Sequence, residues 1–319
     1  MRTILSILIL LGAFACINAE KVNNTKKREV HGTSQNLQGF SLMGDSLISP
    51  PPGEKILARY ETRKANYELD RTKVENLIWY GRFTAYIGNY QEAIDIYSRG
   101  IQAFPKDARL YRHRGHRHLT IRQYDQAIAD FEKAAALIQG TENEIEPDGM
   151  PNAQNIPVST LHGNIYYHLG LAYYLKQDME KALAAYQKCL ASSDNNDNLV
   201  SSTHWLYMIS RRLGLKQEAE KYLEPISPNL DVIENMAYHQ ACLFYKGELK
   251  EADLMDPEGE APANDAIAYA LANWSFYNGD LATAKERYET ILNNPSWNSF
   301  GYLAAEADYY HHFLEKEQQ

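Results

Sequence analysis

The segment EAIDIYSRG at Glu92–Gly100 is one copy of a pattern that recurs along this chain. Every copy has an alanine at the position of Ala93, and four of the six have an aromatic residue at the position of Tyr97. The six anchor alanines are Ala93, Ala127, Ala182, Ala219, Ala252 and Ala284. They are separated by 34, 55, 37, 33 and 32 residues, and the 55 equals one repeat of 34 plus an insertion of 21. A period of this length predicts an array of stacked helical hairpins.

Residues around the anchors complete a two-helix unit. Glycine stands twelve residues before three of the anchors, at Gly81, Gly115 and Gly170. A glycine in the first helix and an alanine in the second let two backbones approach closely, and we expect the aromatic residue to fill the seam to the next unit. Since one hairpin cannot cover its own apolar face, several hairpins must stack to form a stable core.

These residues resemble the tetratricopeptide repeat over roughly Val74–Pro295. The resemblance implies an all-α fold, an α-solenoid of about six such hairpins with a capping helix at each end. We expect the N-terminal cap at residues 54–73 and the solenoid at 74–317, interrupted by an insertion at 140–160 and closed by an amphipathic helix after Trp297. Units four and five depart from the pattern, with Tyr207 and Gln240 in place of the glycine.

The N-terminus predicts export. Residues 1–19 have a positive start, an apolar run and small residues suited to cleavage, as in a signal peptide. The segment ending at Cys16 resembles a loose bacterial lipobox, so we expect either lipidation of Cys16 or ordinary cleavage after Ala15 or Ala19. Residues 20–53 are polar and rich in Gly, Ser and Pro, which predicts a flexible tether. The expected location is the periplasm or the outer membrane, as an anchored lipoprotein, or otherwise the medium.

The net charge of the chain restricts the classes of partner that we expect. A net charge of -9 argues against non-specific binding to nucleic acid or anionic lipid. We therefore expect no nucleic-acid partner and contact with a membrane only through a lipid anchor at Cys16. Cys189 and Cys242, the two other cysteines, lie on apolar faces of predicted helices and are expected to be buried free thiols.

One position of each unit is expected to project into the concave groove, where the resemblance implies that peptides or partner helices bind. It lies fourteen residues before the anchor and holds aromatic or imidazole rings in five units, namely Trp79, His113, His168, Trp205 and Tyr238. Such rings are common binding hot spots. The alternative is that they pack against neighbouring helices.

The first helix of unit two is strongly basic. Arg109, Arg112, His113 and His116 share one helix face, and Arg82 lies in the equivalent place one unit earlier. This face could bind a carboxylate or phosphate of a partner. It could instead pair with the acidic insertion, or it could be ordinary surface charge. The acidic residues of the insertion are Glu142, Glu144, Glu146 and Asp148.

Catalytic and metal-binding motifs are lacking in the sequence, so we expect no enzyme, no cofactor and no metal site. The predicted function is a non-enzymatic scaffold of the bacterial envelope that holds a protein or peptide in its concave groove, and an acidic group of that partner could bind there. One alternative is a lipoprotein that assembles outer-membrane proteins or pili. Another is a receptor or enzyme for a small anionic ligand under the 140–160 insertion.

Overall fold

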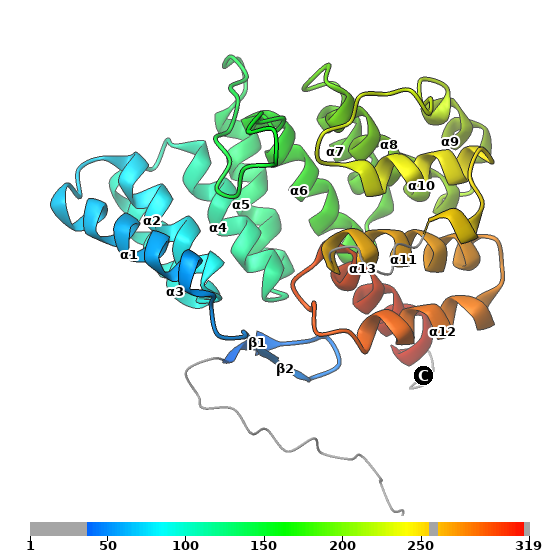
Figure 1. Cartoon of the computed structure of the whole chain (residues 1–319), viewed down its shortest axis with the longest axis horizontal. Helices are drawn as coiled ribbons and strands as arrows, with labels where there is room; N and C mark the ends of the chain where they lie inside the picture. The colour runs from blue at the N-terminus through cyan, green and yellow to red at the C-terminus, as the bar shows by residue number, and fades with distance from the viewer. Residues whose placement is uncertain (1–36, 255–260, 316–319) are drawn as a thin grey trace, which may run out of the picture. The chain divides into compact units, whose positions relative to one another are not determined.

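A computed structural model describes residues 37–254 and 261–315, in which helices pack as consecutive antiparallel hairpins behind a small β-hairpin (Figure 1). The predicted signal peptide, Cys16 and the first part of the tether lie outside these residues. The elements are β1 (Leu37–Phe40), β2 (Ser46–Ile48), α1 (Glu54–Leu69), α2 (Val74–Tyr86), α3 (Tyr90–Ala103), α4 (Ala108–Thr120), α5 (Tyr124–Leu137), α6 (Leu161–Leu175), α7 (Met179–Leu190), α8 (Asn196–Arg212), α9 (Lys216–Leu223), α10 (Met236–Lys246), η1 (Glu251–Asp253), α11 (Ala261–Tyr277), α12 (Leu281–Leu292), α13 (Phe300–Tyr309) and the π-helical η2 (Tyr310–Leu314).

The predicted all-α solenoid is confirmed. Helices α2 to α9 form four successive hairpins, and α11 with α12 forms another. Unit five differs, because its second helix is only the short 3-10 turn η1 and the anchor Ala252 is exposed. Interpreting Ala252 as a packed anchor was therefore wrong. The sequence explains the short turn, since Pro257 follows five residues later and does not fit the interior of a helix.

Glycines of the first helices lie directly beneath aromatic rings of the second helices. A Cβ atom added to Gly81 would come within 2.6 Å of the Tyr97 ring, and one added to Gly170 would come within 2.6 Å of Tyr186. The packing argument therefore holds, with one correction. Each ring covers the glycine of its own hairpin, and does not only fill the seam to the next unit. The two buried cysteines, Cys189 and Cys242, are free thiols as predicted.

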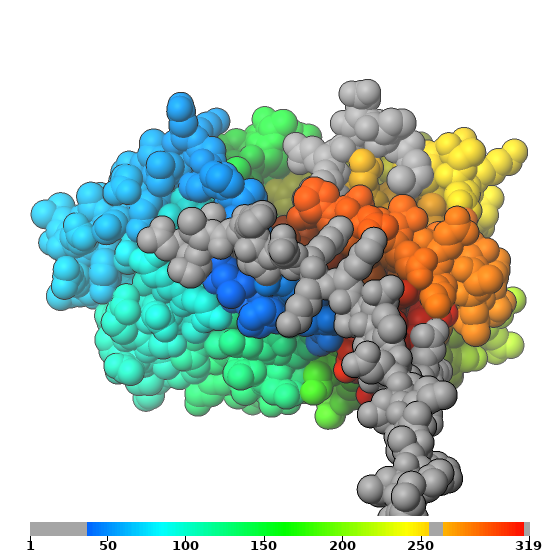
Figure 2. Space-filling model, turned by 90° about the horizontal axis from the view of Figure 1, so that it is seen from below, coloured from blue at the N-terminus to red at the C-terminus, as the bar shows by residue number. Residues whose placement is uncertain are grey.

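The last part of the predicted tether is instead a β-hairpin bound to the helices. The buried side chain of Gln38 accepts hydrogen bonds from the amides of Tyr90 (2.7 Å) and Gln91 (3.3 Å) and so caps the N-terminus of α3. The indole of Trp297 donates to the carbonyl of Ile48 at 3.0 Å. The prediction of a flexible tether is wrong for residues 37–48, because these contacts hold the segment between the first repeats and the C-terminal region (Figure 2).

Helix α13 closes the array from inside. It packs against α11, α12 and α6, and two of its acidic side chains are completely buried. Glu306 pairs with Arg122 and Asp308 pairs with Arg212, each with a nitrogen–oxygen distance of 2.6 Å. The predicted closing helix therefore does more than cover the last hairpin. It occupies part of the inner face that was expected to be an open groove.

Candidate functional site

Helices α2, α4 and α6 bring a group of basic side chains together beneath the insertion. We call this group the arginine–histidine cluster, and its members are Arg82, Arg112, His113, His116, Arg117 and His168. Helix α4 supplies most of them, and Asp107 caps its N-terminus with a carboxylate that accepts a hydrogen bond from the amide of Arg109. Arg112 is 8% exposed, His113 3% and Arg117 9%. A cluster of charged groups this deeply buried requires counter-charges or a ligand.

The insertion supplies counter-charges to the cluster: Glu146 lies beside Arg112, and Arg82 acts on Asp148. Oε2 of Glu146 lies 3.2 Å from Nε of Arg112, and Oε1 lies 3.5 Å from Nε2 of His113. Asn164 donates a hydrogen bond to the same carboxylate at 2.9 Å. The insertion is held further by Arg82, which donates to the carbonyl of Pro147 at 2.7 Å. This is the pairing with the acidic insertion that the sequence left as an alternative.

The pairing is incomplete. Nε of Arg112 is close to Glu146 in distance, but its N–H does not meet hydrogen-bond geometry and is unsatisfied. Arg117 is mostly buried, and its guanidinium lies over the Tyr90 ring, 5.9 Å from the ring centre. Among the residues that the structure describes, no carboxylate or carbonyl binds the Arg117 guanidinium. The cluster therefore has more positive than negative charge.

The imidazoles of the cluster contribute little of this charge. Burial and the nearby arginines lower the pKa values of His113, His116 and His168 well below the ordinary value. Burial also lowers the pKa of Arg112, although Glu146 opposes that effect. At neutral pH the histidines are uncharged, and the positive charge belongs to the guanidinium groups of Arg82, Arg112 and Arg117.

A pocket of about 180 Å³ lies beside the cluster, and we call it the insertion cavity. Asn164 and His168 separate the two sites, because both line the cavity while Asn164 also binds Glu146. Its other lining residues come from the end of the insertion, from α6, α7 and α8, from α10 and the segment before it, and from the start of α13. They include Thr160, Tyr167, Cys189, Asn198, Glu234, Tyr238 and Phe300.

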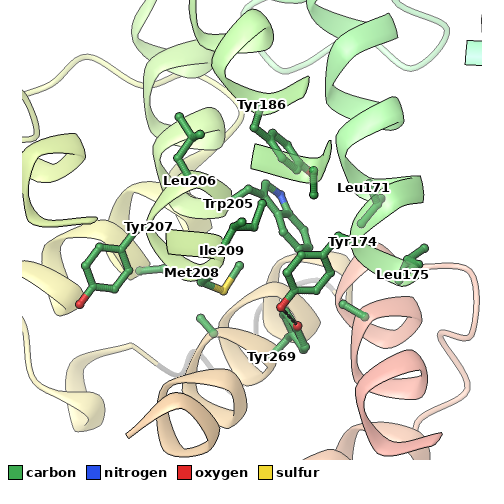
Figure 3. Close-up of a cluster of buried hydrophobic side chains, with 14 of the residues drawn as sticks. Leu171, Tyr174, Leu175, Tyr186, Trp205, Leu206, Tyr207, Met208, Ile209 and Tyr269 are labelled. Atoms are coloured by element: carbon green, nitrogen blue, oxygen red, sulfur yellow. Dashed lines mark hydrogen bonds between the residues drawn. The ribbon is translucent and has the colours of Figure 1, made fainter. Parts of the chain in front are cut away.

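The predicted ladder of rings is not a single line. Trp205 is 1% exposed and belongs to the core, where it stacks on Tyr186 with ring centres 5.6 Å apart (Figure 3). Trp79 lies between the guanidinium groups of Arg63 and Arg82, each less than 5 Å from its ring. Tyr238 lines the insertion cavity. Trp205 was wrongly assigned to the groove, because in this unit the same helical position packs against Tyr174 and Tyr186 of the preceding hairpin.

Arg109 also lies apart from the cluster. Its guanidinium binds Asp107 at 2.9 Å and Glu75 at 3.3 Å, and the Asp107 hydrogen bond is the largest factor that raises its pKa. The expected common face with Arg112 is therefore not formed, since Arg109 lies in the first turn of α4 and is drawn to the acidic residue that caps it.

Sequence reasoning missed two residues of this region. Arg117 was counted among the basic residues of α4 but not assigned to the site, although it lies one residue after His116. Phe300 is far away in sequence, yet its ring centre lies 5.6 Å from His116 and 5.5 Å from His168. The composition of α4 could have indicated Arg117. No pattern in the sequence indicates the contact of Phe300.

Two further observations limit the kind of site. Within residues 37–254 and 261–315, no group of three or more His, Cys, Asp or Glu residues is arranged to hold a metal ion. In the same described part of the chain, no helix is long and apolar enough to cross a membrane.

The hairpins repeat along the chain, each with a first helix packed closely on its second, and this arrangement defines a helical-repeat protein. Residues 163–196 match the model of the tetratricopeptide repeat. This segment of the chain is therefore similar to the tetratricopeptide repeat. Proteins of this family generally serve as protein-binding scaffolds.

Two curated proteins are similar to parts of the chain. Small glutamine-rich tetratricopeptide repeat-containing protein 2 of Saccharomyces cerevisiae is 30% identical over 126 residues, which are 40% of this chain and 30% of that protein. BBSome complex member BBS4 of Bos taurus is 25% identical over 149 residues, 47% of this chain and 24% of that protein. The chain thus spans less than a third of the length of either relative.

Two solved structures have related arrangements. YrrB, described as a TPR protein with an unusual peptide-binding site, is 15% identical, with a TM-score of 0.41 over 72% of this chain and 99% of its own. A tetratricopeptide repeat protein from Parabacteroides merdae is 15% identical, with a TM-score of 0.46 over 78% of this chain and 92% of its own.

Proposed function

We propose that this protein is a non-enzymatic scaffold that binds an acidic group of a protein partner at the arginine–histidine cluster. Three guanidinium groups meet two carboxylates of the insertion, Glu146 and Asp148, and the buried Arg117 binds no carboxylate within the described residues. This charge excess carries the proposal. A partner carboxylate would replace Glu146 or would join it beside Arg117.

The role of Glu146 follows from its position on a surface insertion. Residues 140–160 connect α5 and α6, and only Ile145 and Thr160 pair as an isolated β-bridge. Such connections can move at smaller energetic cost than helices of the core. We infer that Glu146 occupies the place of the partner's acid and lowers the affinity for that acid until it is displaced.

The test is a titration of a fluorescent tetraglutamate peptide into the full-length protein, followed by anisotropy. Arg117→Met should weaken binding about tenfold, because hydrogen bonds to charged groups contribute about 1.5–3 kcal/mol. The fold should tolerate this change, since Arg117 has no acidic partner to leave unpaired. Glu146→Gln should tighten binding, since it removes the competing charge.

The matched control is Arg109→Met, which removes a guanidinium from the same helix but outside the cluster. It should bind the peptide as the wild type does. Equal affinities for Arg117→Met and the wild type, with both proteins folded by circular dichroism, would contradict the assignment of the cluster.

The location in the bacterial envelope is also part of our proposal. It rests on the sequence of residues 1–19, with Cys16 as the acylated residue. Palmitate labelling and cell fractionation of the wild type and Cys16→Ser test it. Loss of label and of membrane association in the variant would support lipidation, whereas an unlabelled wild type in the soluble envelope fraction would support ordinary cleavage. A protein found in the cytoplasm would contradict export.

A further inference from the structure

The insertion cavity presents hydrogen-bond acceptors, in contrast to the neighbouring cluster. Nδ2 of Asn164 donates to Glu146, so the remaining polar group of this side chain is the acceptor Oδ1. Nδ1 of His168 lies 2.6 Å from the carbonyl of Asn164 and must donate to it. Since the pKa of His168 is lowered, its ring is neutral and its Nε2 is an acceptor. Both side chains line the cavity.

Two acidic side chains, Glu234 and Asp197, line the cavity, whereas Arg112 and Arg117 of the cluster act on His168. One oxygen of Glu234 accepts a hydrogen bond from Asn152 of the insertion at 2.6 Å. The charged groups that act most strongly on Glu234 are the carboxylates of Asp148 and Asp197, which together with burial raise its pKa. The side chain of Asp197 is buried, and its oxygens accept hydrogen bonds from three backbone amides of residues 233–235. A positive group at this place would be stabilised by all three acids.

Aromatic rings form the walls of the cavity. The hydroxyl of Tyr167 donates to that of Tyr238 at 3.0 Å and accepts the indole N–H of Trp205 at 2.8 Å, so its own hydrogen bonds are satisfied. The ring of Phe300 lies 6.0 Å from that of Tyr167. Aromatic faces attract cations that have lost part of their water.

We propose that the insertion cavity binds an ammonium group, with Glu234 as its counter-ion, Asn164 and His168 as acceptors, and Tyr238 and Phe300 as walls. Its volume of about 180 Å³ admits a butylammonium-sized group, since cavities of about 150 Å³ accommodate benzene. The ammonium group belongs to a lysine side chain of a partner or to a free small amine. This site adjoins the arginine–histidine cluster and shares His168 with it, but its counter-ion Glu234 belongs to the cavity and not to the cluster.

The test is a titration of the full-length protein, followed through the indole N–H resonances of its four tryptophans. Trp205 is the reporter, because its indole binds the Tyr167 hydroxyl at the cavity wall. The probes are butylammonium and its neutral analogue butanol, and an acetylated, amidated Gly-Lys-Gly peptide and its norleucine analogue. The charged member of each pair should shift the Trp205 signal at lower concentration.

Glu234→Gln should weaken butylammonium binding about fivefold, a change expected for a partly exposed ion pair. It keeps the acceptor for Asn152 and should not disturb the fold. Glu224→Gln is the matched control, because Glu224 is exposed and does not line the cavity. Peptide binding much tighter than butylammonium binding would identify a partner's lysine as the ligand, and equal or weaker peptide binding would identify a small amine.

The proposal is overturned if charged and neutral probes act alike, or if Glu234→Gln binds butylammonium as tightly as Glu224→Gln. Because tetraglutamate binding reports only on the arginine–histidine cluster, a negative result here leaves that function intact. Conversely, if the tetraglutamate titration contradicts the assignment of the cluster, the proposed ammonium site is not affected.

Discussion

Arg122 and Glu306 form a buried bidentate ion pair between residues 184 positions apart in the sequence. Nη2 of Arg122 lies 2.6 Å from Oε2 and its Nε lies 3.1 Å from Oε1, while the carboxylate also accepts the amide N–H of Leu42 at 2.9 Å. Three segments therefore meet at one carboxylate: the β-hairpin, the turn between α4 and α5, and α13.

Replacing Glu306 by Ala should be strongly destabilising. It leaves the Arg122 charge buried without a partner, which costs about 3–5 kcal/mol. Urea denaturation measured by circular dichroism tests this, with Glu218→Ala of an exposed ion pair as a control that should change little. The double change Arg122→Met/Glu306→Leu should recover much of the loss. A single variant as stable as the wild type would show that the pair does not hold α13.

Replacing Gly170 by Ala should destabilise the third hairpin by about 1–3 kcal/mol, because the new methyl group would overlap the Tyr186 ring. Gly115→Ala should cost less, since its Cβ would lie 3.0 Å from Phe131 compared with 2.6 Å at Gly170. Thermal denaturation of the two variants shows which substitution lowers the stability more. If Gly115→Ala were the more harmful change, ring contact at the glycines would not control the close approach of the helices.

Replacing Gln38 by Ala should cost about 1 kcal/mol, the usual effect of losing a helix cap. Its side-chain oxygen is the acceptor for the first amides of α3. Hydrogen exchange should show faster exchange at Tyr90 and Gln91 and leave the first amides of α12 unchanged, since Asp280 caps that helix. Unchanged protection at Tyr90 would mean that the β-hairpin is not bound in solution.

Stability should fall as the solution is made acidic, partly through His204. Burial lowers the pKa of His204 to about 3, so the unfolded chain takes up a proton below pH 6.5 while the folded chain stays neutral until about pH 3. From pH 7 to pH 5 this histidine alone should remove about 2 kcal/mol of stability.

The variant His204→Phe tests whether His204 causes this pH dependence of stability. The variant keeps a ring against Tyr238 and Tyr245, and should lose less stability than the wild type between pH 7 and pH 5 in urea titrations. Identical pH dependence in the two proteins would contradict a depressed pKa for His204.

The repeat pattern predicted most of the fold because it consists of local rules. Spacing between Gly81, Ala93 and Tyr97 reports how two adjacent helices pack, and such neighbours in sequence are neighbours in the structure. Unit five departs from the pattern, as Gln240 in the glycine position and the nearby Pro257 indicated, and its second helix is only a short turn. The prediction of a flexible tether was wrong for residues 37–48 because a polar segment without periodicity looks unstructured in the sequence. Its partners in the fold, Tyr90 and Trp297, are known only from the structure.

The site was predicted only in part. Arg82, Arg112, His113, His116 and His168 do come together, as their positions in successive first helices indicated. The sequence left open whether Glu146 pairs with them, because the path of an insertion is not periodic.

By itself, the sequence determined an all-α array of hairpins and the basic character of α4, since periodicity, small residues and charge are properties of short segments. Only the tertiary structure decided that Trp205 is core, that α13 lies inside the array and that Glu146 covers the arginines. Those outcomes depend on burial and on ion pairs between distant segments. Such interactions contribute to stability only when the whole chain is folded.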